Sequence, residues 1–429
     1  MTTPHPPRSR SAASPHARGE GWGDGNDRGR ASIESRVGAL GDAPFTEPAL
    51  ATHVAPLFSR SLRESPQRIY LANHSLGRPL DAMEDDVRDG LAAWYAQMGG
   101  AWDAWMAEMD AYRTRLARLM GAPASTCIVP KTSAGQGLRA VLNTCDARVR
   151  VVATRGEFDS LDVILREYAR RGRIELVFVE ARPGGRFATD DILDAIVERT
   201  DLVVVSEVIF NTGQRIDRID GIAERAHRFG ARVLLDVYHS LGVFPIDVAA
   251  LDVDFAVGGS YKYLRGGPGA CFLYLHPRHL DGNLRTLDIG WFAKREPFSY
   301  RRPDPPEFAA GGDAFLESTP AVIAWYQARA GQRLAVALDV SRVRAYSLAQ
   351  QRRLVALLAA QGIAAKGGTD DHGAFVVVLH ERAAAWREAL AARGVVTDAR
   401  GNRLRLCPDV VTTDDELVQA AEALGAIAR

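Results

Sequence analysis

The feature that most constrains the fold is an alternation of short β-rich runs with helical segments over residues 127–275. The expected strands are Cys127–Val129, Val149–Ala153, Glu175–Val179, Leu202–Ser206, Arg232–Asp236, Phe255–Gly258 and Ala270–Leu275. The helical segments expected between most of them are Ser133–Thr144, Asp162–Arg170, Asp190–Arg199 and Gly221–Phe229. Strands that alternate with helices predict an α/β fold, with a mainly parallel sheet covered on both faces.

The segments on either side of this region predict two domains and a tail. Residues 1–45 are rich in Ser, Gly, Arg and Pro and have few aliphatic side chains to bury, so we expect a disordered tail, with order beginning near Ala55. A short strand at Arg68–Ala72 and a helical region from Pro79 to Met120 follow. Beyond residue 320 the expected elements are helices over 321–360 and 414–428 and strands at 374–379 and 403–407. We therefore expect a large domain over 46–320 and a small α/β domain over 321–429.

Composition excludes several classes of function. The chain of 429 residues carries 53 basic and 53 acidic residues, so it lacks the positive field that nucleic acid or an anionic membrane would require. No apolar run approaches the roughly 20 residues needed to span a bilayer. The four cysteines lie far apart without a CxxC pair, which is typical of reduced thiols in a cytoplasmic protein. We expect no metal, no nucleic acid and no membrane partner.

The first candidate for chemistry is Lys262, in the Gly-rich segment Gly258–Gly269 between two expected strands. A lone lysine in such a turn is more often a solvated surface residue. In open α/β sheets, however, ligands bind at the carboxyl ends of the strands, where this lysine would lie.

Two further features change the interpretation. Asp236 ends an apolar run, and a buried carboxylate requires a cation or several donors; a pyridinium N–H is such a partner. The carboxylate keeps that nitrogen protonated, so the ring can accept the electrons of a carbanion. Thr132 and Ser133 lie where a strand leads into a helix, a position that binds phosphate although it is often only a helix cap. Together these features predict pyridoxal 5′-phosphate (PLP), held by Lys262 as a Schiff base.

From about Ile69 to the C-terminus the sequence resembles the kynureninase family, PLP hydrolases of fold type I in the class V aminotransferase group. The most specific motifs are Asp236-Val-Tyr-His-Ser-Leu-Gly242, Ser260-Tyr-Lys-Tyr-Leu-Arg-Gly-Gly-Pro-Gly269 and Gly290-Trp-Phe292. Supporting motifs are Asn73–Gly77, Ser206–Gln214, Phe315–Pro320 and Leu404–Leu406. The resemblance implies the PLP-dependent aminotransferase fold.

The resemblance also implies roles for individual residues. The catalytic group would be Lys262, Asp236 and Tyr261. The cofactor would be bound by Thr132, Ser133, Phe158, Asp162, Ser206, Asp236, His239, Tyr261, Lys262, Trp291 and Thr319. The substrate would be bound at its α-carboxylate by Arg405, with Arg403 as the alternative for this role, and Asn73 and Ser75 would lie nearby. Because Trp291 and Thr319 would reach the phosphate of the other subunit, the resemblance implies a homodimer with shared active sites.

Three departures from the family pattern touch these roles. Asn73-His74 stands where the family usually has Gly-Asn, and Ala293-Lys294 follows Phe292 where a His is usual. Phe158–Asp162 replaces a Phe-Pro-Ser/Thr-Asp segment, so the cofactor-contacting Asp is either Asp162, shifted by one residue, or absent. The first two departures lie on the substrate side.

The activity implied by the resemblance is hydrolysis of L-kynurenine or 3-hydroxykynurenine to an anthranilate and L-alanine, a reaction of tryptophan catabolism. Alternatives are another PLP reaction on a small amino acid (a β-lyase, an epimerase or an aminotransferase) or a non-catalytic binding protein of the same fold. A cysteine desulfurase is disfavoured because it needs a cysteine in a mobile loop, whereas Cys407 lies in an expected strand and the other cysteines come earlier.

Overall fold

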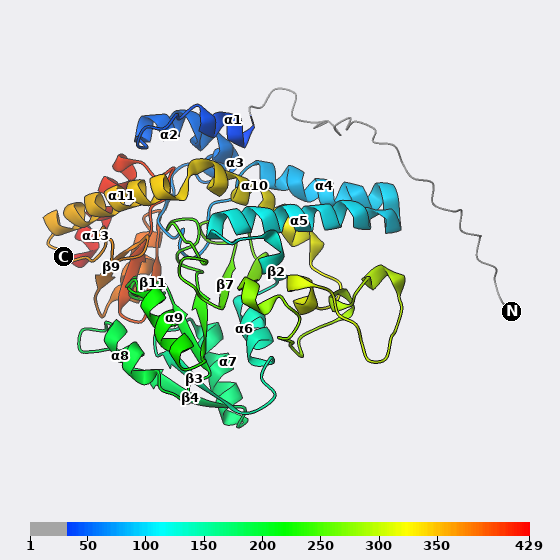
Figure 1. The fold of residues 1–429 in the computed structure, drawn as a ribbon. Helices are drawn as coiled ribbons and strands as arrows, with labels where there is room; N and C mark the ends of the chain where they lie inside the picture. Colours follow the sequence, from blue (N-terminus) through cyan, green and yellow to red (C-terminus); the bar gives the residue numbers. More distant parts are fainter. Residues whose placement is uncertain (1–31) are drawn as a thin grey trace. The chain divides into compact units, whose positions relative to one another are not determined.

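A seven-stranded sheet forms the centre of the fold in the computed structural model, which describes residues 32–429 (Figure 1). In spatial order its strands are β2 (Ile128–Lys131), β8 (Cys271–Leu275), β7 (Phe255–Gly259), β6 (Arg232–Asp236), β5 (Leu202–Ser206), β3 (Val149–Thr154) and β4 (Ile174–Val179). Strands β4, β3, β5, β6 and β7 run parallel to one another, and β8 is antiparallel to both β7 and β2. The predicted fold class, a mainly parallel mixed sheet in an α/β protein, is confirmed.

Both faces of this sheet are buried, as the apolar strand sequences predict. Alternate residues of β5 belong to different hydrophobic clusters: Val203 and Val205 pack in one, Leu202 and Val204 in the other. The helices that connect the parallel strands and cover the sheet are α6 (Ala134–Leu142), α7 (Asp159–Arg170), α8 (Thr189–Ala195) and α9 (Ile219–Arg228). The sheet therefore holds the carboxyl ends of β5, β6 and β7 in fixed positions along one edge.

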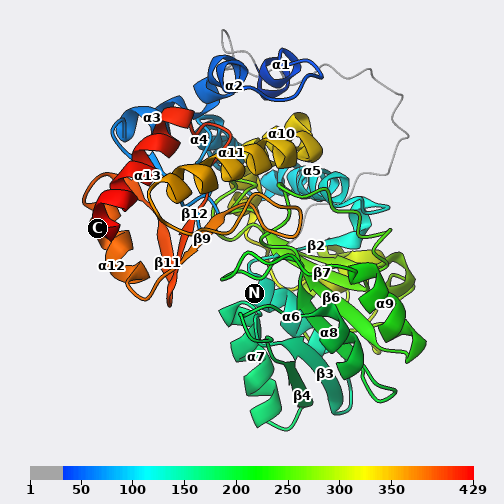
Figure 2. The same ribbon diagram turned by 90° about the vertical axis from the view of Figure 1, so that its left-hand side faces the viewer.

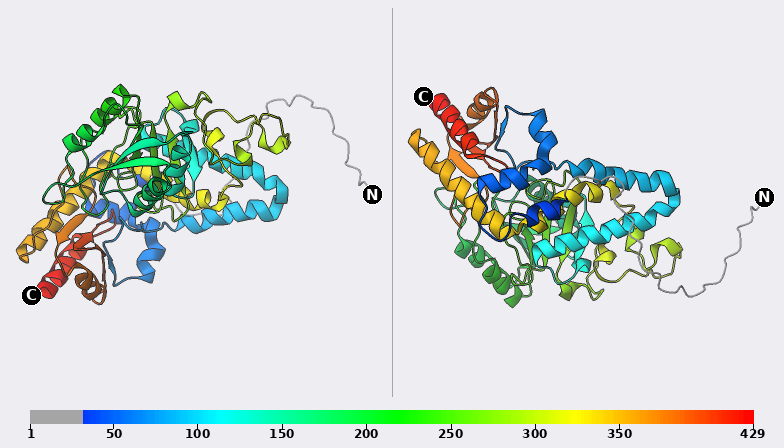
Figure 3. Two further views of the ribbon diagram at one scale, coloured as in Figure 1. Left: turned by 90° about the horizontal axis from the view of Figure 1, so that it is seen from below. Right: turned by 90° about the horizontal axis from the view of Figure 1, so that it is seen from above.

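Three long helices pack together beside the large sheet (Figure 3). They are α4 (Ala82–Gln97), α5 (Ala101–Met120) and α10 (Val322–Leu338). Arg329 of α10 forms ion pairs with Asp86 and Asp89 of α4 and with Glu108 of α5. Asp86 and Glu108 are buried and Asp89 is exposed, and Arg329 connects all three helices through these ion pairs.

The C-terminal region contains a smaller sheet with its own core (Figure 2). Its antiparallel strands are, in order, β11 (Asp398–Arg400), β12 (Arg403–Leu406) and β9 (Val376–Leu379), and its helices are α11 (Val340–Ala360), α12 (Ala383–Ala391) and α13 (Asp414–Ala428). The core also includes Leu71, because β1 (Ile69–Tyr70) pairs in parallel with β10 (Val395–Val396). The division into domains at residue 320 stays a prediction, since an N-terminal strand belongs to the C-terminal core.

The predicted tail of residues 1–45 needs correction in its described part. Helix α1 (Ile33–Gly38) buries Ile33 and Val37, which lie on one face at i and i+4, and Arg333 of α10 forms an ion pair with Glu34. Helices α2 (Glu47–His53) and α3 (Ser59–Glu64), with a 3-10 turn at Ala55–Phe58, follow before β1. Order therefore begins well before Ala55; residues 1–31 lie outside the described residues.

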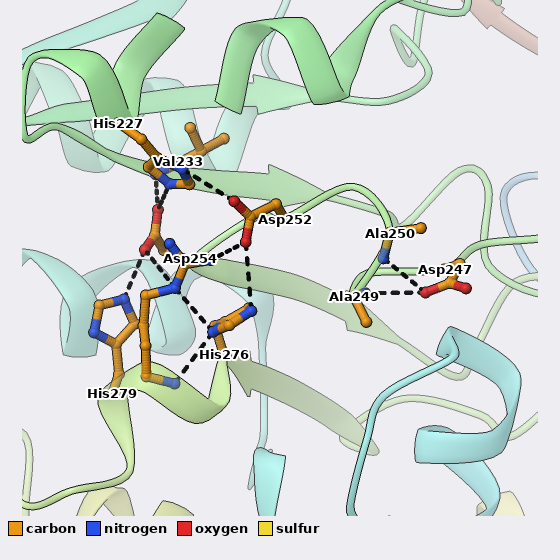
Figure 4. Close-up of polar contacts among 10 residues, drawn as sticks. His227, Val233, Asp247, Ala249, Ala250, Asp252, Asp254, His276 and His279 are labelled. Atoms are coloured by element: carbon orange, nitrogen blue, oxygen red, sulfur yellow. Dashed lines mark hydrogen bonds and ion pairs between the residues drawn. The ribbon is translucent and has the colours of Figure 1, made fainter. Parts of the chain in front are cut away.

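A polar cluster at the amino end of β7 connects three elements (Figure 4). Asp254 is buried, and its Oδ2 accepts the backbone N–H of Val233 at 2.8 Å. His227 Nε2 lies 2.9 Å from Oδ2, and His279 Nε2 lies 2.7 Å from Oδ1. Within residues 32–429, no group of three or more His, Cys, Asp or Glu is arranged to hold a metal ion. No helix in the same part of the chain is long and apolar enough to cross a membrane.

Candidate active site

A cavity lies at the carboxyl ends of β5, β6 and β7. Eight of the predicted site residues line it: Thr132, Ser133, Phe158, Ser206, Asp236, His239, Tyr261 and Lys262. Side chains predicted from separate sequence motifs therefore meet in one cavity. In parallel α/β sheets this edge is where ligands bind.

Backbone contacts fix the loop that carries Lys262. The N–H of Gly77 donates to the carbonyl of Tyr261 at 2.7 Å, and the N–H of Ser260 donates to the carbonyl of Ala270 at 2.9 Å. Arg265, with a positive φ of 54°, closes the turn by donating its N–H to the carbonyl of Lys262 at 3.0 Å. The lysine side chain leaves this turn toward the cavity and is buried.

The Lys262 ammonium has close neighbours in the cavity. Its Nζ lies 2.5 Å from Nε2 of His239 and 4.8 Å from the centre of the Tyr238 ring. Burial lowers the pKa of Lys262, and the charge of Arg405 lowers it further, while Asp236 opposes the shift. Burial also lowers the pKa of His239, so its ring is neutral beside the amine.

Asp236 ends β6 and is buried in the same cavity. Its Oδ1 accepts the backbone N–H of Tyr238 at 2.8 Å. Burial raises the pKa of Asp236, whereas the hydrogen bond and the charge of Lys262 lower it. A carboxylate in this position is stabilised by a cation inside the cavity, which a protonated ring nitrogen supplies.

The turn between β2 and α6 offers donors to an anion. The backbone N–H and the hydroxyl of Thr132 both donate to Oε1 of Gln136, at 2.7 and 3.1 Å. Two donors that converge on one oxygen at a helix N-terminus have the chemistry that a phosphate oxygen requires. The cavity thus combines an amine, a carboxylate and an anion cradle, and these residues fit PLP.

Six of the predicted site residues do not line this cavity: Asp162, Asn73, Ser75, Arg405, Trp291 and Thr319. Asp162 lies in the first turn of α7 and forms an ion pair with Arg166 at i+4, with Nε 2.9 Å from Oδ2. Asn73 Nδ2 donates to the carbonyl of Cys407 at 3.1 Å, and Ser75 Oγ donates to Oδ2 of Asp398 at 2.6 Å. These contacts hold the N-terminal turn (residues 73–77) against β11 and against the residue that follows β12. Asn73 and Ser75 therefore do not line the cavity.

Arg405 lies behind the cavity, buried on β12. Its Nη2 donates to Asp398, its register partner on β11, and its Nη1 donates to the carbonyl of Phe210, which lines the cavity. Nε of Arg405 has no hydrogen-bond partner within residues 32–429. The Nε–H of Arg405, the residue predicted to bind the substrate α-carboxylate, is therefore available to another acceptor.

Trp291 and Thr319 also lie outside this cavity. The indole Nε1 of Trp291 donates to Oγ1 of Thr319 at 3.2 Å, so the two residues contact each other. Their predicted role is in the site of a second subunit, and it stays a prediction.

The sequence interpretation missed several residues of the site. Tyr238 and Cys271 line the cavity and contact each other, with Oη 3.3 Å from Sγ. Glu157 is buried directly behind it, and Asp398 holds Arg405. Tyr238 and Glu157 directly neighbour predicted site segments, which is the signal that could have found them. Cys271 and Asp398 carry no comparable signal.

The fold and the site together define a PLP-dependent enzyme. Residues 78–399 match the family model for class-V aminotransferases, and the chain belongs to that family. PLP is its cofactor.

Relatives of similar sequence include kynureninases and an uncharacterized aminotransferase. A kynureninase of Deinococcus radiodurans is 30% identical over 304 residues, which cover 68% of this chain and 71% of that protein. A kynureninase of Bacillus anthracis is 27% identical over 359 residues, covering 79% and 83%. An uncharacterized aminotransferase of Bacillus subtilis, YcbU, is 28% identical over 356 residues, covering 82% and 91%.

Solved structures share the fold. The cysteine desulfurase CsdA of Escherichia coli superimposes with a TM-score of 0.75 at 17% identity, covering 90% of this chain and 99% of that one. The cystine C–S lyase C-DES, bound to cysteine persulfide, gives 0.76 at 18% identity, covering 85% and 99%. These similarities confirm the predicted aminotransferase fold type I.

Proposed function

We propose that the protein is a kynureninase-type hydrolase. It would cleave the Cβ–Cγ bond of L-kynurenine or 3-hydroxykynurenine with one water molecule, giving an anthranilate and L-alanine. The observation that carries the proposal is the similarity to kynureninases over more than two thirds of the chain, in a protein whose cavity brings together Lys262, Asp236 and Thr132.

Bound PLP supplies an electron sink for the negative charge that develops on the substrate. Lys262 is suited to moving protons because burial lowers its pKa, so its Nζ can be neutral and basic near neutral pH. The neutral His239 ring, 2.5 Å away, orients that nitrogen. Burial raises the pKa of the Tyr261 hydroxyl, which stays protonated and can donate to the phosphate.

Arg405 is the proposed ligand of the substrate α-carboxylate. The buried guanidinium is held from two sides by Asp398 and Phe210, which limits its freedom before substrate binds. A homodimer would complete the site, since Trp291 and Thr319 would then contribute to the cavity of the partner subunit.

A different PLP reaction is the second candidate, since YcbU is a relative of similar identity and Asn73-His74 departs from the kynureninase pattern. A desulfurase is disfavoured by the chemistry of Cys271. Burial raises the pKa of this thiol to about 11, so it is not the thiolate that such a reaction needs.

The test is an assay of the purified, PLP-loaded protein with L-kynurenine and with 3-hydroxykynurenine. We expect loss of substrate absorbance and equimolar formation of the anthranilate and alanine. Lys262→Ala should lose at least about a thousandfold in kcat because it removes the acid–base group, whereas Lys366→Ala, outside the cavity, should retain activity. Consumption of neither substrate would contradict the proposal, and transfer of the amino group to a 2-oxo acid instead would favour an aminotransferase.

A further inference from the structure

A second carboxyl group, Glu157, is buried directly behind the cavity. It precedes Phe158, which lines the cavity, and it is 3% exposed. Its Oε1 accepts a hydrogen bond from the Thr154 hydroxyl at 2.6 Å, and its Oε2 accepts one from the Ser206 hydroxyl at 2.6 Å. Both carboxyl oxygens are therefore bound by neutral hydroxyl groups.

Glu157 is connected to Asp236 through Ser206. Ser206 and Asp236 are register partners on β5 and β6, and both line the cavity. The negative charge of Asp236 acts on Glu157 and raises its pKa. Burial is the larger cause, and together they raise this pKa to about 7 in spite of the two hydroxyl donors.

Charge balance decides which carboxyl group is ionised. Two buried carboxyl groups share one positive charge, and in either form of the protein that charge lies beside Asp236. In the apoprotein it is the ammonium of Lys262, which acts directly on Asp236, and in the PLP-loaded protein it would be the protonated ring nitrogen. Two like charges so close to each other in a low dielectric cannot both be stabilised by one cation. Asp236 has the cation, so the proton belongs on Glu157.

We propose that Glu157 is a positioning residue that holds a proton behind the cofactor, so that Asp236 remains the ionised carboxylate toward the ring nitrogen and Ser206 can donate into the cavity. The proton sits on Oε2 and is donated to Oγ of Ser206, while Thr154 still donates to Oε1. The hydrogen of Ser206 is then free to point into the cavity. When Glu157 loses its proton to solvent, Ser206 turns its hydroxyl back to Oε2 and that donor is lost.

The first experiment looks for the proton directly. Infrared difference spectra of the PLP-loaded protein between pH 5.5 and 8.5 should contain the carbonyl band of a buried carboxylic acid that disappears with a midpoint of about 7. The Glu157→Gln variant, whose amide keeps both hydrogen bonds, should lack this band. Glu180→Gln, which changes an exposed glutamate paired with Arg155, should retain it. Identical spectra of wild type and Glu157→Gln would overturn the proposal.

A second pair of variants tests the assignment without changing Glu157. The Thr154 hydroxyl stabilises the ionised form, so Thr154→Val should move the midpoint up by about one pH unit. Thr154→Ser keeps the hydroxyl and should leave the midpoint within about 0.3 unit. An unchanged midpoint in Thr154→Val would contradict the proposal.

The link to the cofactor has its own readout, the absorbance of bound PLP against pH. In wild type the ionisation of Glu157 should perturb this absorbance with the midpoint of the infrared band. Glu157→Gln resembles the protonated acid at every pH, so its absorbance should lack that transition while PLP stays bound. A folded Glu157→Gln protein with the wild-type profile would reduce Glu157 to a purely structural group and overturn the proposal. This result is independent of whether kynurenine is the substrate.

Discussion

Gly77 shows how closely the N-terminal turn approaches the lysine loop. Its N–H donates to the carbonyl of Tyr261, and a Cβ added at Gly77 would overlap the carbonyl oxygen of Lys262. A side chain larger than hydrogen at this position would have to displace the backbone that aims the lysine.

We therefore expect Gly77→Ala to weaken PLP binding by about tenfold or more, since a displacement costing about 1.4 kcal/mol has that effect. The change in affinity can be measured by titrating the apoprotein with PLP and following absorbance. Gly38→Ala is the matched control, because a Cβ there would meet nothing within 4 Å. Equal affinities of the two variants would contradict the role given to Gly77.

At this scale the sequence predicts some residues of the site and not others. Lys262 and Asp236 could be predicted because each lies at or just beyond the carboxyl end of a buried apolar strand. Asp162, Asn73 and Ser75 could not be placed, because their side chains choose partners that depend on tertiary structure: Arg166, the Cys407 carbonyl and Asp398.

The strands of the large sheet could be predicted to within a residue or two at each end. They are continuous apolar runs bounded by polar residues or turns, and β5 and β6 have the predicted limits. Breaks inside helical regions were harder to predict. The expected helix from Pro79 to Met120 divides at Met98, which has a positive φ of 49°, and the region after residue 320 divides at Asp339, with φ 62°. At the first break Gly99-Gly100 follows Met98, and at the second the side chain of Asp339 caps α11 by accepting the N–H of Ser341.

The contact between elements with the clearest consequence for stability is Asp254, which joins α9, β6 and the turn after β8 (Figure 4). Its hydrogen bonds to His279, His227 and Val233 hold its pKa below the ordinary 3.8 although burial opposes them. A lowered pKa in the folded state means that the stabilisation is present above pH 3.8 and is lost as the pH falls through the folded value.

We expect Asp254→Asn to reduce the free energy of unfolding at pH 7 by about 3 kcal/mol, because the amide removes the negative charge and replaces one of the two acceptor oxygens by a donor. Urea denaturation would measure it, with Asp281→Asn, on the surface, as the control. The difference between wild type and Asp254→Asn should shrink as the pH falls below about 4. A difference that grows on acidification would contradict this account.

Over the whole molecule, two long-range features could not be predicted. The first is that β1 pairs with β10, from opposite ends of the chain.

The second is an aromatic chain from α4 to the segment after β8. The rings of Trp94, Trp105, Trp102 and Phe298 contact one another in sequence. Near them Tyr95 is 86% exposed and Met98 is 67% exposed. Large exposed apolar side chains grouped in this way are typical of an interface.

We expect the wild-type chain to be a homodimer that buries this surface, and Tyr95→Glu combined with Met98→Glu to shift it toward monomer. Sedimentation equilibrium measures the mass, and Leu379→Glu, at a residue that is 61% exposed on β9, is the control. If Trp291 and Thr319 serve the partner's site, the monomeric variant should also bind PLP more weakly. A monomeric wild-type protein with full PLP affinity would contradict the shared site.

The central claim is that Lys262 holds PLP in the cavity formed with Asp236. The sequence contains only three other lysines, Lys131, Lys294 and Lys366, none of which lines this cavity. Borohydride reduction of the PLP-loaded protein, followed by digestion and mass spectrometry, identifies the modified lysine. We predict one phosphopyridoxyl group per chain, on the peptide that contains Lys262. A label on another lysine, or no label on protein that contains PLP, would contradict the account.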